Sequence, residues 1–268
     1  MKQKTIYLLM AMAAMIALLA TSCSKDDENG APVMPPIESF QMDFSDFAEF
    51  PDTTESKKSL QAYQHFAYSY VTVGVWNVIT TVALAVPVAV YLESFKHTPE
   101  FLGDDAWQWT YSMDTYTARL VATRISNEKF TAEMFISKSG VGAFEDFKWF
   151  EGTVRYDHTH ASWKLYESHT ENVQWLDIEW TKDWEAGTSS ITYTNVKVGS
   201  EEFASYITYG IVDDPEYDAF YTLSSATNEV NIKYNTETKA GRVKSPAHFG
   251  NSDWNCWNDL FQNVDCGQ

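Results

Sequence analysis

The chain has 268 residues and a strong excess of acidic side chains: 37 Asp and Glu stand against 19 Lys and Arg, for a formal net charge of −18. A protein this acidic is repelled by the phosphates of nucleic acids and by anionic lipid head groups. Charge therefore argues against both as partners. Aromatic residues make up 15% of the sequence, including ten Trp. They supply a large core or, where exposed, stacking platforms for sugars.

The N-terminus has the features of an export signal. Two lysines precede an apolar stretch at residues 6–20, the order found in secretory signal peptides. Small residues then lead into Cys23 in "LLATSC". This resembles the signal of bacterial lipoproteins, although Ala20 stands where that family usually has Leu. The resemblance implies that residues 1–22 are removed and that the Cys23 thiol is acylated. An ordinary secretory signal with an incidental Cys is the alternative, and an uncleaved membrane helix is disfavoured because the apolar stretch is short.

Residues 23–39 have the composition of a tether. Charged residues are followed by Gly and several Pro, and the apolar residues show neither a helical nor a strand period. The charged run Lys25–Glu28 directly behind Cys23 resembles the surface-export signal of lipoproteins from Bacteroidota. That resemblance implies a lipid-anchored protein of the outer membrane, displayed at the cell surface. The alternative is a solvated linker on a lipoprotein that faces the periplasm.

The remaining residues, 40–268, are predicted to form one globular domain dominated by strands. From residue 106 apolar and polar residues alternate, as where Trp107, Trp109 and Tyr111 are separated by Gln and Thr. Similar segments recur to about residue 248, with short turn-like clusters between them. Such short connections predict an antiparallel meander, because parallel strands need long crossovers.

A long charge-free segment precedes these strands. Residues 71–92, "VTVGVWNVITTVALAVPVAVYL", lie within a charge-free stretch that starts at Ser59. It is too long for one strand, so we expect a helix at about 59–95 that ends or kinks at Pro87. An all-round apolar helix needs cover on every side, either lipid or sheet. We favour sheet, because a mid-chain membrane span conflicts with export and acylation already supplies an anchor.

The predicted fold is therefore α+β and mainly β. A long antiparallel meander is expected to curl as a half-open barrel around one long apolar helix, because twisted strands curl a large sheet. Cys256 and Cys266 are the only cysteines after Cys23. In an oxidising compartment they predict a disulfide within a C-terminal segment, residues 249–268. A two-Cys metal site would need further ligands, and the nearest is His248.

Two acidic side chains are candidates for the catalytic groups of an enzyme. Asp177 and Glu179, in "LDIEW", share one face of a predicted strand, and paired carboxylates are the catalytic groups of glycosidases. The pair resembles the strand motif of some β-sandwich glycoside hydrolases, but the leading acidic position of that motif is Trp175 here. A solvated strand face explains the same residues and is the preferred interpretation.

Two further clusters contain metal-binding residue types. His158 and His160, with His169 nearby, fall in or near a predicted turn, and the loop "DDPEYD" at 213–218 carries Asp213, Asp214, Glu216 and Asp218. Ordinary polar turns explain both. The sequence contains no phosphate-binding glycine loop, no GxSxG elbow and no Cys-His nucleophile pair. We therefore assign no catalytic residue, metal or cofactor.

Binding is the function class that these observations favour. The expectation is a non-catalytic, lipid-anchored protein of the cell envelope that shelters an apolar or amphipathic ligand between sheet and helix. The alternatives are a glycan-binding surface lipoprotein, a glycosidase built on Asp177 and Glu179, and a structural subunit of an outer-membrane complex. A helix that simply fills the barrel would leave no room for a ligand. The ligand-binding candidates are Trp76, Trp107, Trp109, Tyr111, Trp163 and Trp180, with Leu165 and Val78 beside them.

Overall fold

The computed structural model describes residues 30–50 and 61–267. The chain divides into Met1–Ala31 and a compact unit, Pro32–Gln268. All helices and strands of the described residues belong to the compact unit. This unit includes residues 32–39, which the sequence assigned to the tether. Cys23 and the predicted signal peptide lie outside the described residues.

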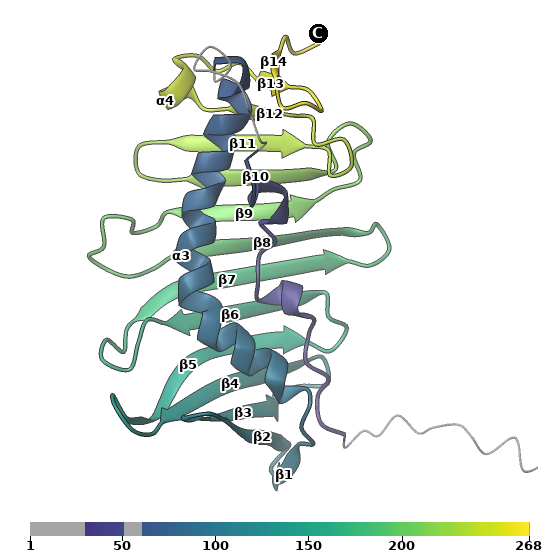
Figure 1. The fold of residues 1–268 in the computed structure, drawn as a ribbon. Coiled ribbons are helices and arrows are strands. Elements are labelled where there is room, and N and C mark those ends of the chain that lie inside the picture. Colours follow the sequence, from purple (N-terminus) through teal and green to yellow (C-terminus); the bar gives the residue numbers. More distant parts are fainter. Residues whose placement is uncertain (1–29, 51–60, 268) are drawn as a thin grey trace, which may run out of the picture. The chain divides into compact units, whose positions relative to one another are not determined.

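A single antiparallel sheet of fourteen strands forms most of the unit, and its strands lie side by side in chain order (Figure 1). The predicted meander is therefore confirmed, and it extends beyond the expected range at both ends. The strands are β1 (Glu100–Gly103), β2 (Ala106–Met113), β3 (Tyr116–Arg124), β4 (Lys129–Lys138), β5 (Phe144–Arg155), β6 (His160–Tyr166), β7 (Gln174–Asp183), β8 (Thr188–Asn195), β9 (Tyr206–Ile211), β10 (Ala219–Ser224), β11 (Glu229–Tyr234), β12 (Gly241–Lys244), β13 (Asn255–Trp257) and β14 (Asn263–Val264).

The two faces of the sheet differ because side chains alternate along each strand. On β3, Ala118, Leu120 and Ala122 are buried, whereas Arg119 and Thr117 point to the other side. The same alternation on the other strands gives one apolar face, here called the inner face. The opposite face, here called the open face, carries Thr, Ser, Lys and Glu side chains and is covered by no other element among the described residues.

One long helix, α3 (Gln64–Ser94), runs across the strands on the inner face (Figure 1). Its backbone approaches the sheet most closely at β2 and β3 near one end and at β12, β13 and β14 near the other. The sheet is not closed into a barrel: among the described residues β1 and β14 each pair with a single neighbour. Pro87 lies inside α3 and does not end it, although the axis changes direction in the C-terminal half (Figure 1).

A second segment covers the inner face beside α3. Residues 32–50, here called the strap, run alongside the helix and include the short 3-10 helices η1 (Ile37–Ser39) and η2 (Ser45–Phe47) (Figure 1). Phe40, Met42 and Phe44 alternate with polar residues. All three are buried. The strap therefore belongs to the core, where its aromatic rings supply much of the buried apolar area.

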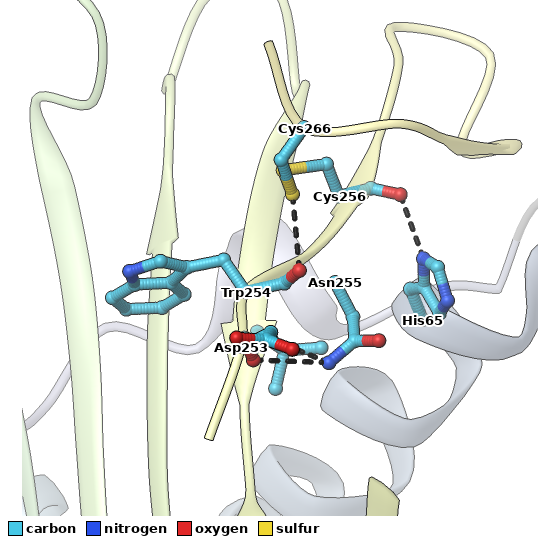
Figure 2. The surroundings of a disulfide bond; sticks show 7 residues. His65, Asp253, Trp254, Asn255, Cys256 and Cys266 are labelled. Carbon is cyan, nitrogen blue, oxygen red and sulfur yellow. Dashed lines mark hydrogen bonds between the residues drawn. A yellow bond between two sulfur atoms is a disulfide. The ribbon is translucent and has the colours of Figure 1, made fainter. Parts of the chain in front are cut away.

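The C-terminal segment holds the start of α3. Cys256 and Cys266 form the predicted disulfide (Figure 2). Nδ1 of His65 donates to the carbonyl oxygen of Cys256 at 2.7 Å, and the side-chain oxygen of Asn263 accepts from the backbone N–H of His65 at 3.0 Å. Asn263 thus satisfies one of the N–H groups left free at a helix N-terminus. The remaining short elements are η3 (Gln61–Tyr63) and α4 (Pro246–Phe249).

The helix is covered on one side only. The segment Gln61–Ser94 has the length and composition of a membrane-crossing helix, and 28% of its most apolar 18 residues are buried in the structure. The expectation that sheet covers the helix all round is therefore wrong. The physical reason is the openness of the sheet, whose edges do not meet over the far side of α3.

Candidate functional site

A groove of about 540 Å³ lies between the strap and the middle of α3. Its floor is Tyr193 of β8, so the groove sits above the centre of the inner face. Apolar side chains line its depth, and polar side chains from the strap and the helix line its rim. The lining residues are Ile37, Glu38, Gln41, Met42, Asp43, Phe44, Ser45, Ala48, Asn77, Thr80, Thr81, Leu84, Ala85, Val88 and Tyr193.

A second, more apolar cavity of about 500 Å³ continues this groove along the helix. The two cavities share Ala48 and Asn77. Together they follow α3 from Tyr70 to Val88, a length of about 27 Å at 1.5 Å per helical residue. The two cavities therefore form one elongated groove along the helix.

Aromatic side chains of the inner face and of α3 hold the strap by its backbone. The hydroxyl of Tyr91 donates to the carbonyl oxygen of Pro35 at 2.7 Å. Nε1 of Trp163 donates to the carbonyl oxygen of Ser39 at 2.9 Å. These donors satisfy carbonyl groups of a segment that pairs with no strand, which is what burial of an irregular segment requires.

The same pattern continues toward the far end of the strap. The Tyr221 hydroxyl donates to the carbonyl oxygen of Asp43, and the Tyr234 hydroxyl donates to a carboxylate oxygen of Asp46 at 3.0 Å. Lys239 forms an ion pair with the same carboxylate. These bonds and the bond from Tyr91 join the strap to the sheet and to α3.

Burial keeps the hydroxyl groups of four tyrosines on the inner face and α3 protonated. Loss of water raises the pKa of Tyr193 and Tyr91 above their ordinary value, and it raises the pKa of Tyr111 and Tyr209 to about 12. At neutral pH all four are therefore uncharged, so each hydroxyl keeps a proton that it can donate.

The groove has an acidic rim. Glu38, Gln41 and Asp43 line it, and they also line a smaller cavity of about 160 Å³ on the other side of the strap. Among the residues that line these two cavities there is no Lys, Arg or His. The rim therefore favours a cationic or neutral polar group over an anionic one.

The aromatic residues predicted to bind ligand lie on the inner face but build the core. Trp107, Trp109, Tyr111, Trp163 and Trp180 are between 1% and 6% exposed. Trp163 contacts the Phe40 ring at 5.6 Å between centroids, so its surface is used by the strap. Of these five, Trp180 lines a described cavity, the smaller one.

The predicted partners on the helix are also distributed differently. Trp76 is half-buried on α3. Val78, expected to face the sheet, is 66% exposed and lines the second cavity. Sequence reasoning missed Met42 and Phe44, which form the apolar wall on the strap side. The alternation in "FQMDF" was the available signal.

The carboxylates considered for glycosidase chemistry lie away from the groove. Asp177 and Glu179 point to the open face of β7, whereas Leu176, Ile178 and Trp180 point inward. Asp177 accepts a hydrogen bond from the side chain of Gln174. Glu179 lies 3.1 Å from Nε2 of His160. No described cavity is lined by either carboxylate, which agrees with a solvated strand face.

The possible metal ligands do not converge. Among residues 30–50 and 61–267 no three His, Cys, Asp or Glu side chains are arranged to hold a metal ion. His158 contacts the carbonyl oxygen of Val33 at 2.9 Å, and His169 stacks on Phe144. In the acidic loop, Asp214 accepts the backbone N–H groups of its own turn, at Glu216 and Tyr217.

Comparison with known proteins found no matching family model, no matching curated protein and no matching solved structure.

Proposed function

We propose that this protein is a lipid-anchored, non-catalytic protein of the cell envelope that shelters an amphipathic molecule in the groove between the strap and α3. The groove is the observation that carries the proposal. It is long, apolar in its depth and polar at its rim, which is the distribution of surfaces that an amphipathic chain requires.

The depth of the groove favours an acyl-like chain. Met42, Phe44, Leu84 and Val88 form an apolar wall without charge. Each methylene group moved from water into such a site contributes about 0.8 kcal/mol, so a chain of moderate length binds without specific polar contacts. The acidic rim at Glu38 and Asp43 then favours a head group that is cationic, zwitterionic or neutral.

The burial of three aromatic candidates supports this proposal over glycan binding. A sugar platform needs aromatic faces that are open to water. Trp107, Trp109 and Tyr111 face inward and are at most 6% exposed. The proposed location, a membrane surface reached through acylated Cys23, comes from the sequence resemblance and supplies a source of amphipathic molecules.

Direct analysis of the natively purified protein tests the proposal. Mass spectrometry should find a copurified amphipathic molecule. In solution, fluorescent acyl probes with the same chain and different head groups should bind saturably, with a fluorescent fatty acid, the anionic probe, binding most weakly.

A matched pair of substitutions tests whether the acyl probes bind in the groove. Ala85 lines the groove, whereas Ala89, one turn further along α3, is exposed and does not line it. Ala85→Trp should fill the groove and weaken probe binding by about tenfold or more, the effect of losing several buried methylene contacts. Ala89→Trp should bind as the wild type does. Saturable binding on a glycan array without uptake of any acyl probe would contradict the proposal.

A further inference from the structure

The outward side of α3 is a continuous apolar surface. Its residues follow one another at alternating spacings of four and three, which keeps them on one line along a helix. The four valines on this line, at 71, 75, 78 and 82, are 61%, 54%, 66% and 76% exposed. The line, here called the outward face, consists of Val71, Val75, Val78, Val82, Ala85, Ala89 and Leu92.

This face is less polar than the side of α3 that the sheet covers. The buried side includes Ser69, Thr80 and Ser94. Each of these hydroxyls donates to a backbone carbonyl of the preceding turn, so burial leaves none of them unpaired. A helix on a water-soluble protein normally shows the reverse distribution, with polar residues outward. The outward face therefore needs a cover that water does not provide.

Hydrocarbon suits this face better than a polar-rimmed protein interface. Protein interfaces carry about one hydrogen bond per 100–200 Å² and a polar rim. The outward face offers no charge, since residues 59–92 contain no Asp, Glu, Lys or Arg. The neighbouring hydroxyl of Thr81 already donates to Asn77 at 2.9 Å. Hydrocarbon needs no hydrogen-bonding or charged groups on the surface that it covers.

The strap starts near the C-terminal end of α3. There the hydroxyl of Tyr91, on the buried side of the helix, donates to the carbonyl oxygen of Pro35. The chain from Cys23 to Pro32 can extend to about 30 Å at most. An acyl group on Cys23 would therefore keep α3 within reach of the bilayer surface.

We propose that α3 docks in the plane of the membrane, with its outward face in the hydrocarbon boundary of the leaflet that holds the lipid on Cys23. Interfacial helices of this kind lie about 5–10 Å deep. Val75 and Val78 belong to the outward face and also line the second cavity. Docking would therefore place the second cavity against the lipid, the source of the proposed ligand. This inference rests on the lipid anchor and the groove of the proposed function and adds the surface on which the protein sits.

Vesicle flotation of a chain that begins at residue 24 measures membrane binding by the outward face without the lipid on Cys23. This chain keeps the whole compact unit, which starts at Pro32. The chain should float with phosphatidylcholine vesicles, and phosphatidylglycerol should weaken flotation because the protein carries a large negative charge. Val78→Glu with Val82→Glu should lower the bound fraction about tenfold or more, since charged side chains partition poorly into the hydrocarbon boundary.

The matched control is Val141→Glu with Val198→Glu. These valines are 95% and 87% exposed, lie outside α3 and add the same charge, so this variant should float as the wild type does. All four substituted side chains point to solvent, and thermal unfolding should show that both double variants are folded. If the Val78/Val82 variant floats as the wild type does, the inference is wrong.

Spin labels in the acylated protein give a second measurement. Labels at Val78→Cys and Val82→Cys should be accessible to oxygen and protected from an aqueous nickel chelate. A label at Lys164→Cys, exposed on the open face, should be accessible to the chelate. Equal chelate accessibility at all three positions would reject docking and leave the lipid anchor standing. Absence of an acyl group on Cys23 would reject the anchor and leave the flotation result standing.

Analytical ultracentrifugation separates lipid docking from self-association. A wild-type dimer that the Val78/Val82 variant dissociates, together with no flotation of either chain, would overturn the inference in favour of a second copy on the outward face. Groove binding is measured separately with the acyl probes, so its failure does not decide the outcome of these experiments.

Discussion

The hydroxyl of Tyr193 holds two backbone groups of the strap at once: it accepts a hydrogen bond from the N–H of Met42 at 2.6 Å and donates one to the carbonyl oxygen of Phe40 at 3.0 Å. Tyr193 is also the floor of the groove. The residue therefore links the position of the strap to the shape of the proposed binding site.

Replacing Tyr193 by Phe should lower the free energy of unfolding by about 1–3 kcal/mol, because two buried backbone groups lose their partner. Chemical denaturation measures the loss, and amide exchange at Met42 should accelerate. Tyr166→Phe is the control, since the Tyr166 hydroxyl bonds to Glu151 on the open face. Equal unfolding free energies for the two variants would show that the strap is held by packing alone.

The buried tyrosines predict sensitivity to alkali. Their pKa values are raised by burial, so the folded state holds these protons more tightly than the unfolded chain, whose tyrosines titrate near 10. Their contribution to stability is therefore complete below pH 10. It is lost as the pH rises toward the folded values, which are about 12 for Tyr111 and Tyr209.

The expected slope above pH 10 is about 1.4 kcal/mol per pH unit for each such tyrosine. Denaturation curves at several pH values, compared with tyrosine ionisation followed by absorbance, measure it. Tyr193→Phe should reduce the slope. A free energy of unfolding that stays flat to pH 12 would contradict the prediction.

The disulfide between Cys256 and Cys266 closes a short loop. Chain entropy predicts that its removal by Cys256→Ser with Cys266→Ser costs about 2–3 kcal/mol of stability. Because this segment bonds to His65, amide exchange should also rise at the start of α3. Wild-type protein treated with reductant should behave like the double variant. Peptide mapping without reductant that finds two free thiols would refute the pairing.

Gly152 allows Trp163 to lie across the sheet. A Cβ atom at this position would overlap the Trp163 ring and the carbonyl oxygen of Ser162. Gly152→Val should therefore destabilise the protein by about 1–3 kcal/mol and loosen the bond from Trp163 to the strap. Gly74→Ala is the control: a Cβ there meets nothing within 4 Å, so this helical substitution should stabilise slightly. Gly152→Val should therefore lower the melting temperature, and Gly74→Ala should raise it slightly.

The proposed acylation of Cys23 predicts a location for the protein. A chain exported by an ordinary cleavable signal and carrying Cys23→Ala should lack the acyl mass and leave the membrane fraction on dilution, because an interfacial helix alone binds reversibly. The wild-type protein should stay. If the variant resists both dilution and alkaline washing, α3 spans the bilayer and its position on the sheet in Figure 1 does not describe the membrane-bound protein.

Local patterns in the sequence specify the secondary-structure elements of this protein and their order. Alternating apolar residues specify strands, and their short connections leave the antiparallel meander as the only order that fits. The charge-free stretch specifies a helix, because it is too long for one strand. Cys256 and Cys266 were expected to pair because no other Cys follows Cys23.

The position of the strap and the openness of the sheet depend instead on contacts between residues that are far apart in the chain. Met42 and Tyr193 are 151 positions apart, and the alternation in "FQMDF" marks a buried face without showing that the inner face of the sheet covers it. Whether the sheet closes depends on the accumulated twist of fourteen strands rather than on any one of them. That openness leaves the outward face of α3 uncovered and places the groove beside the strap instead of inside a barrel.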